Sequence, residues 1–170
     1  MQFISIIIPV YNHLPELKQA LRSIKAQTYK PLEVIIVDDG SVVPVEGQID
    51  RQEFEFEIKF YTQANLGASA ARNAGFNISR GELVIFWDAD VVAEPTLLQK
   101  MHNVLTIHPE ASYVYSDFFY GRKKMPAQKF DADKLREKNY IMTTSLIRRE
   151  DFAGYDEKLK RFQDWDLWLT

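Results

Sequence analysis

The sequence contains no cysteine among its 170 residues, which excludes disulfide bonds and metal sites built on thiolates. It also lacks the run of roughly 20 apolar residues that a membrane-spanning helix needs. The apolar run at residues 3–10 is too short for a secretion signal, contains Pro9 and follows no basic segment. These absences predict a cytoplasmic chain, and they leave open a peripheral contact with the inner face of a membrane.

The sequence has no excess of basic residues either. Its 21 Lys and Arg residues are outnumbered by 24 Asp and Glu residues, which gives a formal net charge of −3. Proteins that bind nucleic acid through bulk electrostatics carry a positive field, so no nucleic-acid partner is expected. The length suits one domain with a sizeable core. No pattern in the sequence specifies an oligomeric state.

Short apolar runs alternate with helical patterns along the first part of the chain. Residues 3–9 and 33–37 are uninterrupted apolar or nearly apolar runs rich in branched side chains, which indicates buried strands. Between them, apolar residues recur at three- and four-residue spacing from Leu14 to Ile24, which predicts a helix with Asn12 as its cap. Two parallel strands joined by a helix form a right-handed crossover unit.

The remaining elements continue this alternation. Strands are expected at residues 54–60, 83–87, 113–119 and 140–147, and helices at 68–75, after Glu94-Pro95, at 131–138 and from 163 onward. A loop or one short helix is expected at residues 42–53, and a mobile basic loop at 121–131. Strands that alternate with helices predict an α/β fold of three layers, α/β/α, with a mostly parallel central sheet.

The most informative stretch is Leu83–Asp90, where five apolar residues are followed by Asp88 and Asp90. Extended chain would point these two carboxylates the same way, and like charges there repel unless a cation lies nearby. A hard divalent cation completed by substrate phosphates is a common solution. Two other predicted strands end in polar residues at the same sheet edge, at Pro9–Asn12 and Asp38–Ser41. Asp-Gly-Ser is also a common turn, and Asp-x-Asp is frequent on surfaces, so the argument depends on their occurring together.

Together these motifs resemble the GT-A nucleotide-sugar glycosyltransferases of family 2. The matching segments, in the family's order, are Ile6–Asn12, Gln27–Tyr29, Val37–Ser41, Asn65–Gly67, Ala71–Gly75, Asp88–Asp90 and Gln163–Trp168. The resemblance implies a Rossmann-like GT-A domain over residues 1–170, with a nucleotide-binding half at 1–90 and an acceptor-side half at 91–170. The second half is expected to be truncated at its C-terminus, because the chain stops inside a periodic apolar pattern.

The resemblance also assigns roles to residues of the nucleotide site. It implies that Pro9 and Tyr11 cradle the nucleobase, with Tyr11 as a stacking face. Asp39 would accept a hydrogen bond from a base N–H, which favours a uracil-like edge and hence UDP. Arg72 would approach the base or the diphosphate. Asp88 would contact the ribose or the water shell of a metal.

Two further carboxylates carry the implied chemistry. Asp90 would ligate Mg²⁺ or Mn²⁺, which stabilises the negative charge on the leaving diphosphate. Asp164 would be the catalytic base that takes the proton of the acceptor hydroxyl, opposite the leaving group, so that the anomeric centre inverts. Asp166 is the nearby alternative base, but two positions along a helix it would face away from Asp164.

Three of these residues have structural alternatives. Asp39 would otherwise accept hydrogen bonds from the backbone amides of a turn. Arg72 would otherwise be an arginine on the solvent side of a helix, and Asp164 a helix cap.

The leading hypothesis is an inverting, metal-dependent glycosyltransferase. It would move a sugar from a nucleotide-sugar donor to a hydroxyl of a saccharide or lipid-linked acceptor, in the synthesis of cell-surface polysaccharide or glycolipid. One alternative is a sugar nucleotidyltransferase, but those enzymes begin with a glycine-rich turn where this chain has Pro9–Asn12. Another is a nucleotide-binding fragment without full activity.

Overall fold

The parallel part of the sheet is built from the apolar runs of the first 90 residues, in a computed structural model that describes residues 1–170. Its four strands are β1 (Ile4–Val10), β2 (Leu32–Asp38), β3 (Glu57–Thr62) and β4 (Leu83–Phe86). They lie parallel in the order β3-β2-β1-β4. Strands β2 and β4 are buried along their whole length, as expected for apolar runs that are covered on both faces.

The second half of the chain extends the sheet with short antiparallel strands. Strand β8 (Leu146–Arg148) pairs with β4 on one side and with β5 (Tyr113–Val114) on the other. Three of the five pairings in this six-stranded sheet are parallel, which confirms the predicted mostly parallel sheet. Strands β6 (Phe118–Tyr120) and β7 (Lys123–Met125) form a separate hairpin.

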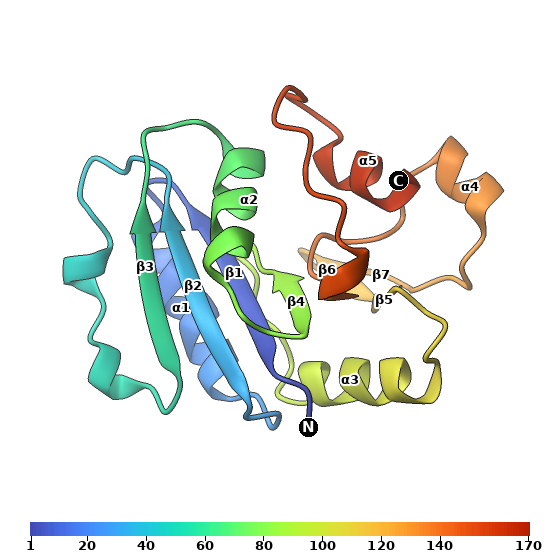
Figure 1. Ribbon diagram of the computed structural model, residues 1–170, viewed down its shortest axis with the longest axis horizontal. Helices are drawn as coiled ribbons and strands as arrows, with labels where there is room; N and C mark the ends of the chain where they lie inside the picture. Colours follow the sequence, from blue (N-terminus) through green and yellow to red (C-terminus); the bar gives the residue numbers. More distant parts are fainter.

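Helices cover both faces of the sheet, which confirms the three-layer α/β/α fold (Figure 1). They are α1 (Leu14–Lys25), α2 (Ala68–Ile78), α3 (Leu97–Ile107), α4 (Ala132–Glu137) and α5 (Gln163–Leu169), with 3₁₀ turns at Glu46–Gln48, Arg51–Glu53 and Arg149–Asp151. Helices α1 and α3 pack on one face, in a core of 23 buried residues. Helices α2, α4 and α5 pack on the other, in a core of 12. None of these helices combines the length and hydrophobicity needed to span a bilayer.

The start of α1 differs from the prediction. Strand β1 continues through Pro9 to Val10, and α1 begins at Leu14 with His13 in the cap position and no capping side chain. Asn12 is not the cap. It has a positive φ of 58°, and its side-chain oxygen accepts a hydrogen bond from the backbone N–H of Val42 at 2.9 Å. Asparagine tolerates this left-handed backbone better than most residues.

Other predicted strands are shorter in the structure. The strand expected at 54–60 begins at Glu57, because Phe54 and Phe56 pack against the core from the preceding loop. The strand expected at 113–119 divides into β5 and β6, and the one expected at 140–147 is reduced to β8. The basic loop expected at 121–131 contains β7, whose Lys124 pairs with Asp117 at 2.6 Å beside the hairpin.

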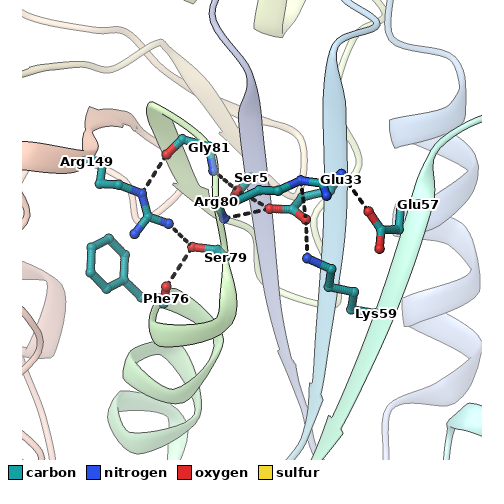
Figure 2. A network of polar contacts seen from close by, with 9 residues as sticks. All are labelled: Ser5, Glu33, Glu57, Lys59, Phe76, Ser79, Arg80, Gly81 and Arg149. Atoms are coloured by element: carbon teal, nitrogen blue, oxygen red, sulfur yellow. Dashed lines mark hydrogen bonds and ion pairs between the residues drawn. The ribbon is translucent and has the colours of Figure 1, made fainter.

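A buried carboxylate joins the strands near their amino ends (Figure 2). Glu33, on β2, has no exposed side-chain surface. It accepts hydrogen bonds from the Ser5 hydroxyl at 2.7 Å, the Lys59 ammonium at 2.8 Å and the Arg80 backbone N–H at 2.8 Å. The Ser5 oxygen in turn accepts the backbone N–H of Gly81 at 2.7 Å. A Cβ at Gly81 would lie 2.6 Å from the Ser5 backbone nitrogen, so a larger residue does not fit there.

The same region ties the second half of the chain to the first (Figure 2). Arg149, just after β8, donates to the Gly81 carbonyl at 2.6 Å and to the Ser79 hydroxyl. Its guanidinium carbon also lies 4.5 Å from the centre of the Phe76 ring, a cation–π contact. The turn between α2 and β4 is therefore held from both sides.

Replacing Glu33 by glutamine is expected to lower the free energy of unfolding at neutral pH by about 2–4 kcal/mol, because Lys59 and Arg80 lose a buried anionic partner. Burial raises the pKa of Glu33, but the hydrogen bonds from Lys59, Ser5 and Arg80 outweigh burial and hold it below its ordinary value of 4.5. A carboxyl whose pKa is depressed by folding stabilises the fold above its unfolded pKa, and this contribution is lost as the pH falls through the folded value. Urea unfolding at several pH values should therefore show the two proteins converging below pH 4.5.

Glu55→Gln is the matched control, because Glu55 is exposed and faces Lys30 at 3.7 Å. Its unfolding curve should stay close to that of the wild type. Equal losses for the two variants would contradict a special role of Glu33.

Candidate active site

The loops at the carboxyl ends of β1, β2 and β4 enclose a cavity of about 390 Å³. Its lining residues are Pro9, Val10, Tyr11, His13, Asp39, Asn65, Gly67, Ala68, Arg72, Asp88, Ala89 and Asp90. Six of the seven site residues expected from the sequence are among them, and only Asp164 is not. This edge is where open α/β sheets bind ligands.

A second cavity of about 390 Å³ lies between α4, α5 and β8. Its lining is mainly apolar and includes Tyr113, Leu135 and Trp168, with Arg136 and Asp151 as its charged residues. A single carboxylate supplies too few ligands for a divalent cation site, which needs several oxygen ligands. Chemistry that uses a metal and a diphosphate fits the first cavity better.

The loop after β1 is fixed to the loop after β2. The backbone N–H of Asn12 donates to the Ser41 hydroxyl at 3.0 Å, and the backbone N–H of Val42 donates back to Asn12 Oδ1 at 2.9 Å. Tyr11 lies just before this link, with 44% of its surface exposed. Its aromatic side chain is therefore accessible at the cavity, beside Pro9.

The two acids after β2 hold two different loops. Asp38 accepts the backbone N–H groups of Ser41 at 2.8 Å and Val45 at 3.1 Å. Asp39 accepts the backbone N–H groups of Leu66 and Gly67, both at 2.9 Å. The turn-holding role given above as the alternative for Asp39 is thus present in the structure.

Asp39 retains capacity for a further hydrogen bond. Besides the two amides, it accepts the Gln63 side-chain N–H at 2.8 Å. A carboxylate offers roughly four lone-pair positions, so about one remains. Because Asp39 also lines the cavity, that position is a candidate acceptor for a ligand N–H.

Arg72 is buried at the back of the cavity, and only 7% of its side-chain surface is exposed. Its Nη2 donates to Asp88 Oδ1 at 2.7 Å, and its Nη1 lies 3.9 Å from Asp164 Oδ1. The alternative of an arginine on the solvent side of a helix is therefore wrong. Burial lowers the pKa of Arg72, but Asp88, Tyr155 and Asp164 together raise it above its ordinary value, so the guanidinium stays charged.

Asp88 and Asp90 lie in the turn beyond β4, which ends at Phe86. The expectation that they continue the strand is therefore wrong, but both acids line the same cavity. Desolvation raises the pKa of Asp88, Arg72 lowers it, and the charges of Asp164 and Asp90 raise it, with a net upward shift. Two carboxylates, Asp88 and Asp164, thus face the Arg72 guanidinium, and Asp90 adds a further negative charge at the cavity.

This excess of negative charge suits a divalent cation. No group of three His, Asp or Glu side chains is placed to hold a metal by protein ligands alone. Asp90 would therefore supply part of the coordination and phosphate oxygens of a ligand the rest, a common arrangement for Mg²⁺. Asp88 would contact the ribose or the metal's water shell. Carboxylate oxygens suit both Mg²⁺ and Mn²⁺.

Asp164 lies on α5, next to Arg72, and does not line the cavity. Its Oδ2 accepts the Thr143 hydroxyl at 2.6 Å, and its buried Oδ1 has no hydrogen-bond partner. The cap position of α5 is Phe162, and no side chain caps the helix, so the cap alternative for Asp164 is not observed. Asp166 makes no ion pair with Arg72, unlike Asp164.

The sequence analysis missed several residues around the site. His13 lines the cavity, and so do Asn65 and Ala68. Thr143 and Tyr155 contact Asp164 and Arg72, respectively. His13 adjoins the motif at Pro9–Asn12 and could have been flagged, but the other contacts join distant parts of the chain.

Comparisons with known proteins agree with this geometry. A family model described as "Glycosyl transferase family 2" matches residues 5–161. An uncharacterized glycosyltransferase of Bacillus subtilis is 33% identical over 98% of this chain and 66% of its own length. Glycosyltransferase GlyA of Streptococcus pneumoniae is 39% identical over 59% of this chain and 14% of its own length. The chain thus spans only part of these relatives.

Solved structures share the fold at low sequence identity. TarS residues 1–349 from S. aureus superpose with a TM-score of 0.78 and 20% identity, over 97% of this chain and 53% of that one. The same TarS fragment has been solved in complex with UDP and with UDP-GlcNAc. A mannosyltransferase from Pyrobaculum calidifontis, in complex with GDP-Man and Mn²⁺, has a TM-score of 0.74 and 18% identity, over 95% of this chain and 50% of that one.

Replacing Asp39 by alanine is expected to lower the free energy of unfolding by about 1–3 kcal/mol, because the backbone amides of Leu66 and Gly67 lose their acceptor. Hydrogen exchange should quicken most at the amides of Leu66 and Gly67. Asp90→Ala is the control, since Asp90 is exposed and its removal should leave those two amides protected. Unchanged exchange in Asp39→Ala would show that the turn does not depend on this carboxylate.

Proposed function

We propose that this chain, which belongs to glycosyl transferase family 2, transfers a sugar from a nucleoside diphosphate to an acceptor hydroxyl with inversion at the anomeric carbon. The observation that carries the proposal is the meeting of Asp88 and Asp164 at the Arg72 guanidinium. This proximity supports Asp164, from the second half of the chain, as a base that acts beside a diphosphate site in the first half.

The proposed donor is a UDP-sugar. Tyr11 offers an accessible aromatic ring for the base, and Asp39 has a free lone-pair position for a base N–H. Uracil presents an N–H of this kind, flanked by carbonyl groups. The TarS complexes with UDP and UDP-GlcNAc support this choice, whereas the mannosyltransferase complex contains GDP-Man.

The proposed cofactor is Mn²⁺ or Mg²⁺, with Asp90 as the direct ligand and Asp88 contacting the ribose or the metal's water shell. When bound, the cation supplies a Lewis acid that stabilises negative charge on the leaving diphosphate. The manganese in the mannosyltransferase complex supports this assignment. Arg72 keeps its positive charge and holds Asp88 in place.

Asp164 is the proposed base. Its Oδ1 is free of hydrogen bonds, while its Oδ2 is held by Thr143. The acceptor oxygen attacks the anomeric carbon as Asp164 takes its proton, and the bond between that carbon and the diphosphate oxygen breaks. Attack from the side opposite the leaving group inverts the centre.

The two halves of the chain divide this work. Residues 1–90 supply the nucleotide site and residues 91–170 supply the acceptor side. The proposed acceptor is a saccharide or lipid-linked hydroxyl in cell-surface polysaccharide or glycolipid synthesis, and the proposed location is the cytoplasm, at the inner face of the membrane. The family match favours sugar transfer over the nucleotidyltransferase alternative.

The β6–β7 hairpin is the proposed membrane contact. Phe119 and Tyr120 are 64% and 82% exposed there, next to the exposed Arg122 and Lys123. Aromatic and basic side chains favour the interface of an anionic membrane.

The double variant Phe119→Ser, Tyr120→Ser should sediment less with vesicles that contain phosphatidylglycerol, while Ile107→Ser should behave like the wild type. Equal sedimentation of all three would refute this contact.

Replacing Asp164 by asparagine is expected to slow donor turnover by about 10²–10⁴-fold, because the base is lost. UDP release from UDP-GlcNAc in the presence of Mn²⁺ measures turnover to water without a known acceptor. Affinity for UDP should stay within about threefold, since Asp164 does not line the donor cavity.

Asp166→Asn is the matched control on the same helix, and its turnover should remain near that of the wild type. A loss confined to Asp166→Asn would transfer the role of base to Asp166.

A further inference from the structure

A side-chain amide joins the two halves of the chain beside the site. Asn73, on α2, donates from Nδ2 to the Tyr155 carbonyl and accepts the Tyr155 backbone N–H at Oδ1, both at 2.9 Å. Its Nδ2 also lies 2.9 Å from Glu157 Oε1. Asn73 and Tyr155 are 82 residues apart in the chain. This paired hydrogen bond fixes the backbone of Tyr155 against α2, as a neighbouring strand would.

The backbone before Tyr155 is shaped for this contact. Gly154 has a φ of 94°, in the left-handed region that side chains rarely adopt. Tyr155 itself is 4% exposed. The centre of its ring lies 5.0 Å from that of Phe86, in an edge-on arrangement. It lies 5.8 Å from that of Phe152, in a tilted arrangement. The ring is therefore held from the sheet and from its own segment.

The ring of Tyr155 lies against Arg72, the residue next to Asn73. The guanidinium carbon is 5.1 Å from the ring centre, within the range of a cation–π contact. The edges of the guanidinium point elsewhere, with Nη2 on Asp88 and Nη1 at 3.9 Å from Asp164. The Nε atom has no hydrogen-bond partner, so ring contact is an important constraint on the tilt of the group.

The hydroxyl of Tyr155 makes no hydrogen bond, although it is buried. A buried polar group without a partner adds no stability. The contribution of Tyr155 to the site therefore comes from its ring and its backbone.

We infer that Tyr155 is a positioning residue for sugar transfer: its ring, clamped to α2 by Asn73, orients Arg72 so that Asp164 is held at the correct distance from the donor site. This inference rests on the proposed function, because it concerns the efficiency of that reaction. It adds to that function a residue that touches neither donor nor acceptor and acts through Arg72.

The test compares three variants of the full chain by UDP release from UDP-GlcNAc with Mn²⁺. Tyr155→Leu should lower kcat by about 10–100-fold, since a displacement of about 1 Å at a reacting group costs up to 10²-fold. KM should change less than about threefold, because Tyr155 does not line the donor cavity and the hydrogen bond from Arg72 to Asp88 remains. Tyr155→Phe should retain the wild-type kcat. Asn73→Asp, which loses the donor to the Tyr155 carbonyl but keeps the acceptor, should fall between them.

Tyr113→Leu is the matched control. Tyr113 lies in the same half of the chain, is partly buried and, like Tyr155, has a hydroxyl without a hydrogen-bond partner. The centre of its ring lies 5.0 Å from that of Trp168, and it does not pack on Arg72. Its kcat should match the wild type. A purely structural role of Tyr155 would instead lower kcat and UDP affinity together in Tyr155→Leu, in step with a lower Tm, and would overturn the inference.

Two other results would also overturn it. A wild-type kcat in Tyr155→Leu would show that the ring is not needed, and an equal loss in Tyr155→Phe would place the role in the hydroxyl.

The guanidinium signals of Arg72 in ¹⁵N spectra give a readout that does not require turnover. They should shift and broaden in Tyr155→Leu and stay unchanged in Tyr155→Phe. Should the wild type itself release no UDP, the proposed function fails, and these spectra still decide whether Tyr155 positions Arg72.

Discussion

The contact on which the site depends is the ion pair of one buried arginine with carboxylates from both halves of the chain. Arg72 donates to Asp88 at 2.7 Å and lies 3.9 Å from Asp164, and its side chain is almost wholly buried. With Asp90 also at the cavity, negative charge exceeds positive charge there. Like charges this close together repel one another unless a cation is recruited. The excess of negative charge therefore favours binding of a metal with a diphosphate.

The two ends of the parallel sheet serve different purposes. Near the amino ends, Glu33 has protein partners for its carboxylate and is closed to solvent, so it contributes stability. At the carboxyl ends, Asp38 and Asp39 hold the loops, and one lone-pair position of Asp39 remains for a ligand. Asp88 differs from Glu33, because desolvation raises the pKa of Asp88 above its ordinary value, whereas hydrogen bonds hold that of Glu33 below it. A carboxyl with a raised pKa thus lies at the edge where chemistry is proposed, as is common for functional sites.

The sequence predicted the parallel half of the fold well, because β1, β2 and β4 are apolar runs whose burial follows from composition alone. It predicted β5, β6 and β8 poorly, since strands of two or three residues are defined by their partners. The family resemblance located the cavity residues, and the structure shows Asp39 in the turn-holding role that was its alternative. The contacts of Thr143 and Tyr155 were not predictable, because they join residues 21 and 82 positions apart, to Asp164 and Asn73 respectively.

Calorimetric titration of UDP with and without Mn²⁺, on the wild type and on Asp90→Asn, tests the central claim most directly. The charge excess at the cavity predicts that Mn²⁺ tightens UDP binding to the wild type by at least about tenfold, or 1.4 kcal/mol. The gain should largely disappear in Asp90→Asn, while metal-free binding stays similar in both proteins. Equal UDP affinity of the wild type with and without Mn²⁺ would contradict the account, because the carboxylates beyond β4 would then not hold a cation against the diphosphate.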